Sequence, residues 1–196
     1  YCLGMDMPRD TLDEVSDETL LVLYANGDPS AARLLTTRLS PRVLGYATRL
    51  LADRAEAEDV TQEAMMRLWR IAPQWRAGEA QITTWLYRVV TNLCTDLRRS
   101  RRRRPGIGLD DAPEVASTTA SAVSNLMQAD RMTALQRALD QLPDRQRAAI
   151  VLTYYEDRPN AEAAAVLDMN IKAFESLLLR ARAALRKAFA AQGDAR

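Results

Sequence analysis

The stretch TWLYRVVTNLCTDLRRSRRRR, residues 84–104, joins an apolar stripe to an arginine cluster on one predicted helix. Its apolar residues recur at intervals of three and four, which is the spacing of one helix face. They are Leu86, Val89, Val90, Leu93 and Leu97. The cluster of Arg98, Arg99 and Arg101 to Arg104 follows directly. We expect a helix from about Thr84 that packs along one face and carries a strong positive charge at its end.

The same apolar spacing recurs in both directions along the chain and favours an all-α fold without strands. Ser16 is a good N-cap for a first helix, and Asp53 with Glu56 resembles a capping box for a later one that ends at Pro73. Between them we expect two helices, the second of which begins at Ser40 and Pro41. The helix from Asp53 to Pro73 is the last one expected before the helix at 84–104.

Residues 105–128 carry no Lys or Arg and many small residues, which is typical of a flexible linker. We therefore predict two small helical domains, at 17–104 and 129–192. The acids of the linker are Asp110, Asp111 and Glu114. In the second domain, helices at about 161–167 and 171–189 flank a turn at 168–170, the spacing of a helix-turn-helix.

Composition excludes several classes of function. The formal net charge is +1, so nucleic-acid binding must depend on local charge. The chain has no histidine and two cysteines, Cys2 and Cys94, which disfavours zinc sites, disulfides and His-based catalysis. No apolar run is long enough to enter a membrane. Setting residues 1–4 aside, we expect a cytoplasmic protein without cofactor or metal, in which Cys94 is a buried apolar side chain rather than a redox switch.

The arginine cluster favours nucleic acid as its partner, because several guanidinium groups can neutralise phosphates and release counterions. No acid lies within it, and a favourable interaction with the helix dipole is the alternative explanation. Trp75, Trp85 and Tyr87 precede the cluster and offer faces on which unpaired bases stack. For Trp85, burial in the core is the competing interpretation.

The second helix of the helix-turn-helix has a polar face suited to the major groove. Its apolar face contains Ile171, Phe174, Leu178, Ala181 and Leu185, and its outward residues are Lys172, Glu175, Ser176, Leu179 and Arg180. Lys, Ser and Arg supply donors for base edges and phosphates. A helical hairpin with a solvated face would show the same periodicity.

Two motif sets resemble the extracytoplasmic-function sigma factors of the sigma-70 family. The segments 59–64, 68–70 and 84–92 are similar to their region 2, and the segments 142–147 and 180–185 to their region 4. The resemblance extends over about residues 17–189, in the same order and with a linker between. It implies an alternative sigma factor without catalytic residues, which binds core RNA polymerase through its β′ and β subunits, recognises promoter DNA and is controlled by an anti-sigma factor.

The resemblance also implies site residues. Contacts with core polymerase would come from Asp59, Gln62, Glu63 and Arg67. The −10 element would be bound by Trp75, Arg76, Trp85, Tyr87, Asn92, Arg98 and Arg99, with an extruded base held by the loop at 73–83. The −35 element would be read by Lys172, Glu175, Ser176, Leu179 and Arg180.

The chain departs from the family pattern at the predicted recognition helix. Asp168 replaces the usual turn glycine, which is tolerable because Asp adopts left-handed backbone readily. Glu175 and Leu177 replace residues that are often basic, so Leu177 and Leu179 are alternatively a partner surface.

Two other functions are compatible with parts of the sequence. A free-standing helix-turn-helix regulator would bind promoter DNA without polymerase. A metal-dependent hydrolase using Glu56, Glu58 and Asp59 is the third hypothesis, although dipole capping explains these acids better.

Overall fold

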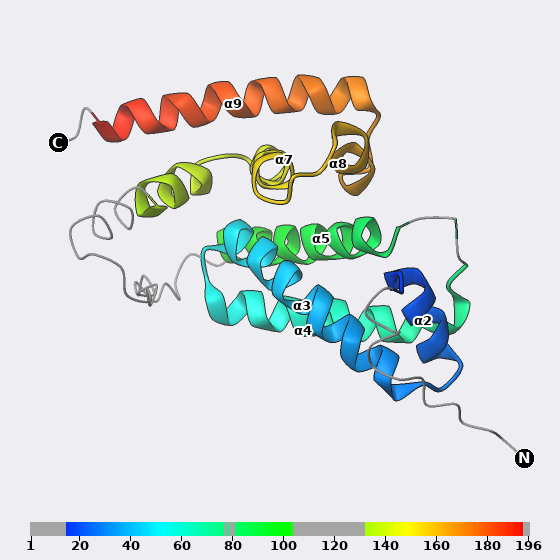
Figure 1. The fold of residues 1–196 in the computed structure, drawn as a ribbon. Coiled ribbons are helices and arrows are strands. Elements are labelled where there is room, and N and C mark those ends of the chain that lie inside the picture. The colour runs from blue at the N-terminus through cyan, green and yellow to red at the C-terminus, as the bar shows by residue number, and fades with distance from the viewer. Residues whose placement is uncertain (1–14, 77, 79–80, 104–131, 194–196) are drawn as a thin grey trace, which may run out of the picture.

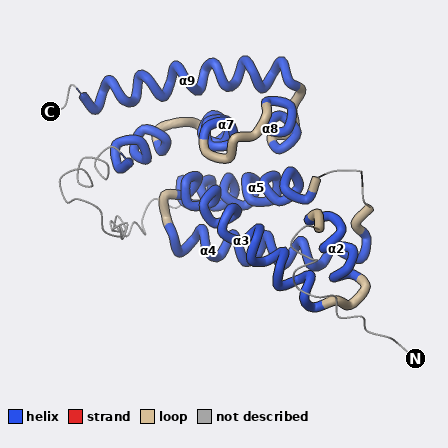
Figure 2. The backbone as a smooth tube through the Cα atoms, viewed as in Figure 1, coloured by secondary structure: helices blue, strands red, loops and turns tan. Residues whose placement is uncertain are grey.

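The computed structural model describes residues 15–76, 78, 81–103 and 132–193, and every regular element in them is helical (Figure 2). This confirms the predicted all-α class. The first half contains α2 (Asp17–Ala25), α3 (Pro29–Leu51), α4 (Arg54–Ile71), the short 3-10 helix η1 (Ala72–Gln74) and α5 (Ile82–Arg103). The Ser16 hydroxyl accepts from the Thr19 amide, and the Asp53 carboxylate accepts from the Glu56 amide, so both predicted N-caps are confirmed.

The expected break at Pro41 is wrong, because α3 is one continuous helix with Pro41 in its interior. Proline removes a backbone donor, but Pro41 itself is exposed and the helix is held from the other side. Leu35 and Leu39 before it and Val43, Tyr46, Ala47 and Leu50 after it are all buried. Packing of this single face outweighs the local preference for a break.

The core of the first half is the common face of α3, α4 and α5. Its largest buried side chains include Tyr46 from α3, Leu68 from α4 and Leu86 from α5. Tyr46 and Thr91 share a hydrogen bond of 2.7 Å inside this core. Burial raises the pKa of the Tyr46 hydroxyl, which therefore stays neutral.

The second half begins with a helix at residues 132–140, followed by α7 (Asp144–Tyr154), α8 (Asn160–Val166) and α9 (Ile171–Gly193). The predicted turn is confirmed: Asp168 has a left-handed φ of 55°, and the Asn170 side chain accepts from the Ala173 amide at the start of α9. Ile171 is 48% exposed, so its assignment to the apolar face of α9 is wrong. It lies in the first turn, before the helix reaches the core.

The two halves pack against each other, with α7 and α8 lying over α5 and the end of α3 (Figure 1). Helix α9 covers the other side of α7 and α8. We call the contact surface of α3 and α5 with residues 132–140, α7 and α8 the closure interface. The predicted linker at 105–128 lies outside the described residues. The domain limits at 17–104 and 129–192 remain predictions.

Candidate protein and nucleic-acid interfaces

The outer face of α4 carries the residues predicted to bind core polymerase. The inner face buries Val60, Ala64 and Leu68, and this fixes the orientation of the helix. Asp59 and Gln62 are exposed, while Glu63 and Arg67 are partly exposed and form a salt bridge of 2.7 Å. The four residues thus lie together on one accessible polar face.

Two tryptophans bracket the loop between η1 and α5. The rings of Trp75 and Trp85 meet edge to face, with centroids 6.4 Å apart, and both side chains are partly buried. The Trp75 indole Nε1 is buried and has no acceptor among the described residues. Arg76 beside Trp75, and Asn92 and Arg99 on α5, are exposed. Part of the aromatic surface predicted for bases is therefore accessible, together with three polar side chains.

The arginine cluster has acidic partners that lie far away in the sequence. Arg101 pairs with Asp53 at 3.1 Å and with Glu56 at 2.5 Å, whereas Arg102 pairs with Asp144 at 3.0 Å. Arg99 and Arg103 are exposed. No acid lies within the cluster itself, but helix packing brings carboxylates from both halves to the end of α5.

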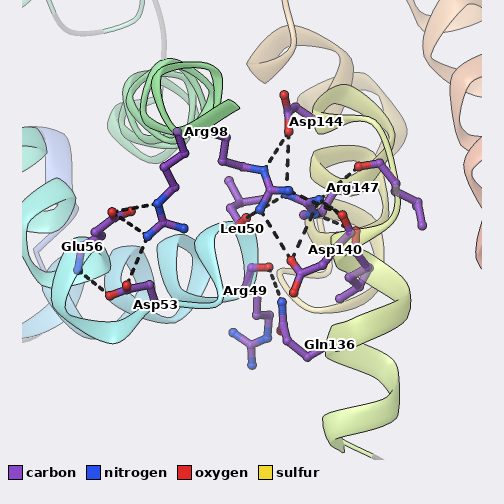
Figure 3. A network of polar contacts seen from close by, with 12 residues as sticks. Arg49, Leu50, Asp53, Glu56, Arg98, Gln136, Asp140, Asp144 and Arg147 are labelled. Atoms are coloured by element: carbon purple, nitrogen blue, oxygen red, sulfur yellow. Dashed lines mark hydrogen bonds and ion pairs between the residues drawn. The ribbon is translucent and has the colours of Figure 1, made fainter. Parts of the chain in front are cut away.

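Arg98 is part of a polar network in the closure interface (Figure 3). Its Nε lies 2.9 Å from Asp144 Oδ1, and its Nη1 lies 3.5 Å from Asp140 Oδ1. Its Nη1 also donates to the Leu50 carbonyl at the end of α3. The side chain is 15% exposed. Arg98 therefore faces the C-terminal half in this arrangement.

Arg147 is the buried centre of the same network (Figure 3). Its guanidinium donates to four backbone carbonyls at 2.7–3.0 Å, those of Leu50, Leu139, Asp140 and Leu142. Burial and the nearby Arg98 lower the pKa of Arg147 to about 10, so it remains charged at neutral pH. Burial raises the pKa of Asp140, against the opposing influence of Arg147 and Arg98. Sequence patterns did not identify the role of Arg147, because its hydrogen-bond acceptors are mainly backbone atoms.

A second cluster in the closure interface surrounds Tyr87, which is only 2% exposed. Its hydroxyl donates to Glu156 Oε2 at 2.6 Å, and the Arg158 guanidinium lies 5.0 Å from the centre of its ring. Burial and the Glu156 carboxylate raise the pKa of Tyr87 to about 12. Arg49 pairs with Glu156 at 3.8 Å, and Arg88 pairs with Asp168 of the helix-turn-helix turn.

The outer face of α9 displays all five residues predicted to read the −35 element. Lys172, Glu175, Ser176, Leu179 and Arg180 are exposed, and Leu179 is 64% exposed. The inner face buries Phe174, Leu178 and Ala181 against α7 and α8. Leu177 is also buried, so its predicted outward position is wrong. Leu177 lies three residues after Phe174 and four before Ala181, which places it on the same buried helix face.

The remaining candidate residues are Cys94 and the acids Glu56 and Glu58. Cys94 is 1% exposed, which confirms its buried position, and burial raises its thiol pKa to about 12. Glu56 and Glu58 are engaged by Arg101 and Arg54. Among the described residues, no three His, Cys, Asp or Glu side chains gather as metal ligands. Within the same ranges, no helix combines the length and apolarity needed to cross a membrane.

A helix-turn-helix that follows an all-helical domain with a partly exposed aromatic and cationic surface places the chain in the class of DNA-binding transcription proteins. Family models agree with this class: sigma-70 region 2 matches residues 35–104, and sigma-70 region 4 matches residues 132–185. The ECF RNA polymerase sigma factor SigM of Mycobacterium tuberculosis is 35% identical over 175 residues, which are 89% of this chain and 85% of SigM. The ECF RNA polymerase sigma-E factor of Escherichia coli is 28% identical over 181 residues, covering 88% and 94%.

The chain belongs to the extracytoplasmic-function sigma factors of the sigma-70 family. It is an alternative sigma factor, whose partners are core RNA polymerase and promoter DNA. Its fold is similar to that of CnrH in complex with the cytosolic domain of CnrY, with a TM-score of 0.66, 24% identity and coverage of 89% of this chain and 97% of that one. RpoE of Bartonella quintana in complex with the anti-sigma factor NepR has a TM-score of 0.63, 22% identity and coverage of 80% and 94%.

Proposed function

We propose that this sigma factor binds core polymerase through the outer face of α4, captures the −10 element with α5 and its preceding loop, and reads the −35 element with α9. The observation that carries the proposal is the face of α4. The apolar side of α4 is buried in the core, whereas its accessible side carries Asp59, Gln62, Glu63 and Arg67. A free-standing regulator has no need of such a face.

Promoter melting in this proposal requires binding energy and no covalent chemistry. Unstacking a base costs a few kcal/mol, and stacking on an aromatic side chain returns about 1–3 kcal/mol per base. The edge-to-face pair of Trp75 and Trp85 supports such a stacking site, with Arg76, Asn92 and Arg99 near it as donors. The protein is then a binding subunit and not an enzyme.

An anti-sigma factor is the proposed regulator. Support comes from the two related folds, which were solved with the cytosolic domain of CnrY and with the anti-sigma factor NepR. Since core polymerase and promoters are inside the cell, the cytoplasm is the proposed site of action.

The role of α4 is tested by measuring the affinity of core polymerase for a Gln62→Ala, Glu63→Ala variant. A matched control is Arg54→Ala, Glu58→Ala, which removes an exposed ion pair from the start of the same helix without changing net charge. We expect the first variant to bind core polymerase at least about tenfold more weakly, since interface residues of this kind contribute more than 1 kcal/mol when central. Equal affinities for the two variants would exclude the α4 face as the docking surface.

A further inference from the structure

We propose that Glu18 of α2 is a positioning residue for base capture, because it holds the first turn of α5 and thereby fixes Trp85 against Trp75. The two tryptophans are called the tryptophan pair below. The inference rests on the −10 stacking role proposed for this pair. Glu18 acts on it through the backbone of α5 and not as a DNA contact.

Glu18 supplies a hydrogen-bond acceptor to the start of α5. Its Oε1 accepts from the Ile82 amide at 3.4 Å, in partly buried surroundings and across 64 positions of the sequence. The first amides of a helix have no acceptor within the helix itself, and a carboxylate beside them is also favoured by the helix dipole. The Ile82 side chain is fully buried. Losing Glu18 would therefore leave a poorly solvated amide at the point where α5 begins.

The turn that Glu18 holds is the turn that carries Trp85. Trp85 follows Ile82 by three residues, and its amide donates to the Gln81 carbonyl at 3.1 Å. Its ring meets the Trp75 ring edge to face, with centroids 6.4 Å apart. A shift of this first turn would therefore change the distance and the angle between the two rings.

Trp75 is supported by the same helix from the other side. Helix α2 packs against η1, which leads directly into Trp75 (Figure 1). The Trp75 amide donates to the Ala72 carbonyl at 3.1 Å, and Ala72 is buried. Helix α2 therefore braces both backbone segments from which the tryptophan pair projects.

Helix α2 can act as a brace because it is itself held to the core. Leu20 and Leu21 are fully buried. Arg38 of α3 pairs with Asp17 at 3.1 Å and donates to the Val15 carbonyl at 2.7 Å. Rings that are ordered before binding lose less conformational freedom when a base stacks on them. A fixed α2 thus favours base capture without touching the base.

The test uses the polymerase holoenzyme and a single-stranded oligonucleotide with the nontemplate −10 strand of a promoter that it transcribes. Glu18→Ala removes the acceptor, Glu18→Met removes it but keeps the length of the side chain, and Glu18→Gln retains a neutral acceptor. The control, Glu58→Ala, removes the same charge from an exposed position at the start of α4. Fluorescence anisotropy measures the affinity for the oligonucleotide, and the affinity for core polymerase is measured separately.

We expect Glu18→Ala and Glu18→Met to bind the oligonucleotide about tenfold more weakly than the parent, because hydrogen bonds to charged groups are stronger than neutral ones. Glu18→Gln should lose less, and the control should match the parent. Affinity for core polymerase should be unchanged in all four. The proposal is overturned if the Glu18 variants bind the oligonucleotide as the control does. If Glu18→Ala fails to fold by circular dichroism, Glu18→Met decides.

A positioning role also requires that Glu18 act through the tryptophan pair. In a Trp75→Ala background, Glu18→Ala should cause little further loss of affinity for the oligonucleotide, since the effects of coupled residues do not add. A general structural role predicts additive losses instead. Additive losses would show that Glu18 acts elsewhere and would overturn the proposal.

Failure of the −10 role itself is seen in other variants. Normal oligonucleotide binding by Trp75→Ala would reject the stacking function proposed for the pair. Near-UV circular dichroism of the full chain reports the ordering of the tryptophan rings without DNA. We expect Glu18→Ala to lose part of the tryptophan signal, as Trp85→Phe does. An unchanged spectrum for Glu18→Ala would reject the positioning role, whatever the result with DNA.

Discussion

Arg147 carries a positive charge buried in the closure interface, where it donates to backbone carbonyls of both halves. Its acceptors come from three segments: Leu50 lies in the last turn of α3, Leu139 in the last turn of the helix at 132–140, and Leu142 in the turn before α7. Cations are favoured at helix C-termini, where carbonyls lack intrahelical donors. Arg147 therefore holds these three segments together at the closure interface.

Replacing Arg147 with Ala should destabilise the protein by about 2–4 kcal/mol, because buried carbonyls lose their donors and Asp140 loses a neighbouring cation. Arg147→Lys should recover only part of this loss, since an ammonium cannot match the planar fork. Urea unfolding followed by circular dichroism measures both. Two variants as stable as the parent would show that the network contributes nothing to the fold.

Glu175 gives the outer face of α9 an acid where DNA readers usually present donors. It is exposed between Lys172 and Ser176, and the described residues give it no ion pair. A carboxylate accepts from the cytosine amino group, so we expect the parent to favour cytosine at one −35 position by about 1–3 kcal/mol. Glu175→Ala should lose that preference and bind other bases more evenly. Selection of −35 duplexes with both proteins measures it, and an unchanged preference after substitution would remove Glu175 from base reading.

At this scale, residues whose role depends on local backbone geometry were predictable. Ser16, Asp53 and Asp168 act within a few residues of themselves, and the structure agrees with each. The partners of Arg98 and Arg101 were not predictable, because their carboxylates are 42–48 residues away. Sequence spacing identifies a charged side chain but not which distant group neutralises it.

Helix α3 shows where local rules are insufficient for whole elements. The proline rule predicted two helices, and a single stripe of buried residues on either side of Pro41 produced one. Periodicity predicted the buried stripe of α3 correctly, but it did not show that packing of this stripe would outweigh the effect of Pro41. By contrast, α4, α5 and α9 were predictable, because each carries an apolar stripe at helical spacing.

Pro41→Ala should stabilise the protein by about 1–2 kcal/mol. It restores an amide donor to the Thr37 carbonyl, and the gain is reduced because alanine leaves the unfolded chain freer than proline does. The substitution is at an exposed position and touches no proposed site. Thermal and urea unfolding compared with Arg42→Ala, an exposed neighbour on the same helix, measures it. A loss of stability would mean that Pro41 shapes α3 in a way that packing requires.

The packing of the two halves against each other was the least predictable feature of the molecule. Motifs identified both halves and their order, but the hydrogen bonds across the closure interface join residues 42 or more positions apart in the chain. Its acids, Asp140, Asp144, Glu156 and Asp168, have no pattern of their own. Two halves with separate cores can dock in several ways, and only tertiary geometry shows which surfaces meet.

The most direct test of the central claim is transcription initiation by purified core polymerase on a promoter library, with and without this protein. The account predicts transcripts that require the protein, whose promoters share one −35 and one −10 sequence, and that fall in the Gln62→Ala, Glu63→Ala variant. It is contradicted if core polymerase gains no transcript while the protein alone binds a defined duplex site, as a free-standing regulator does.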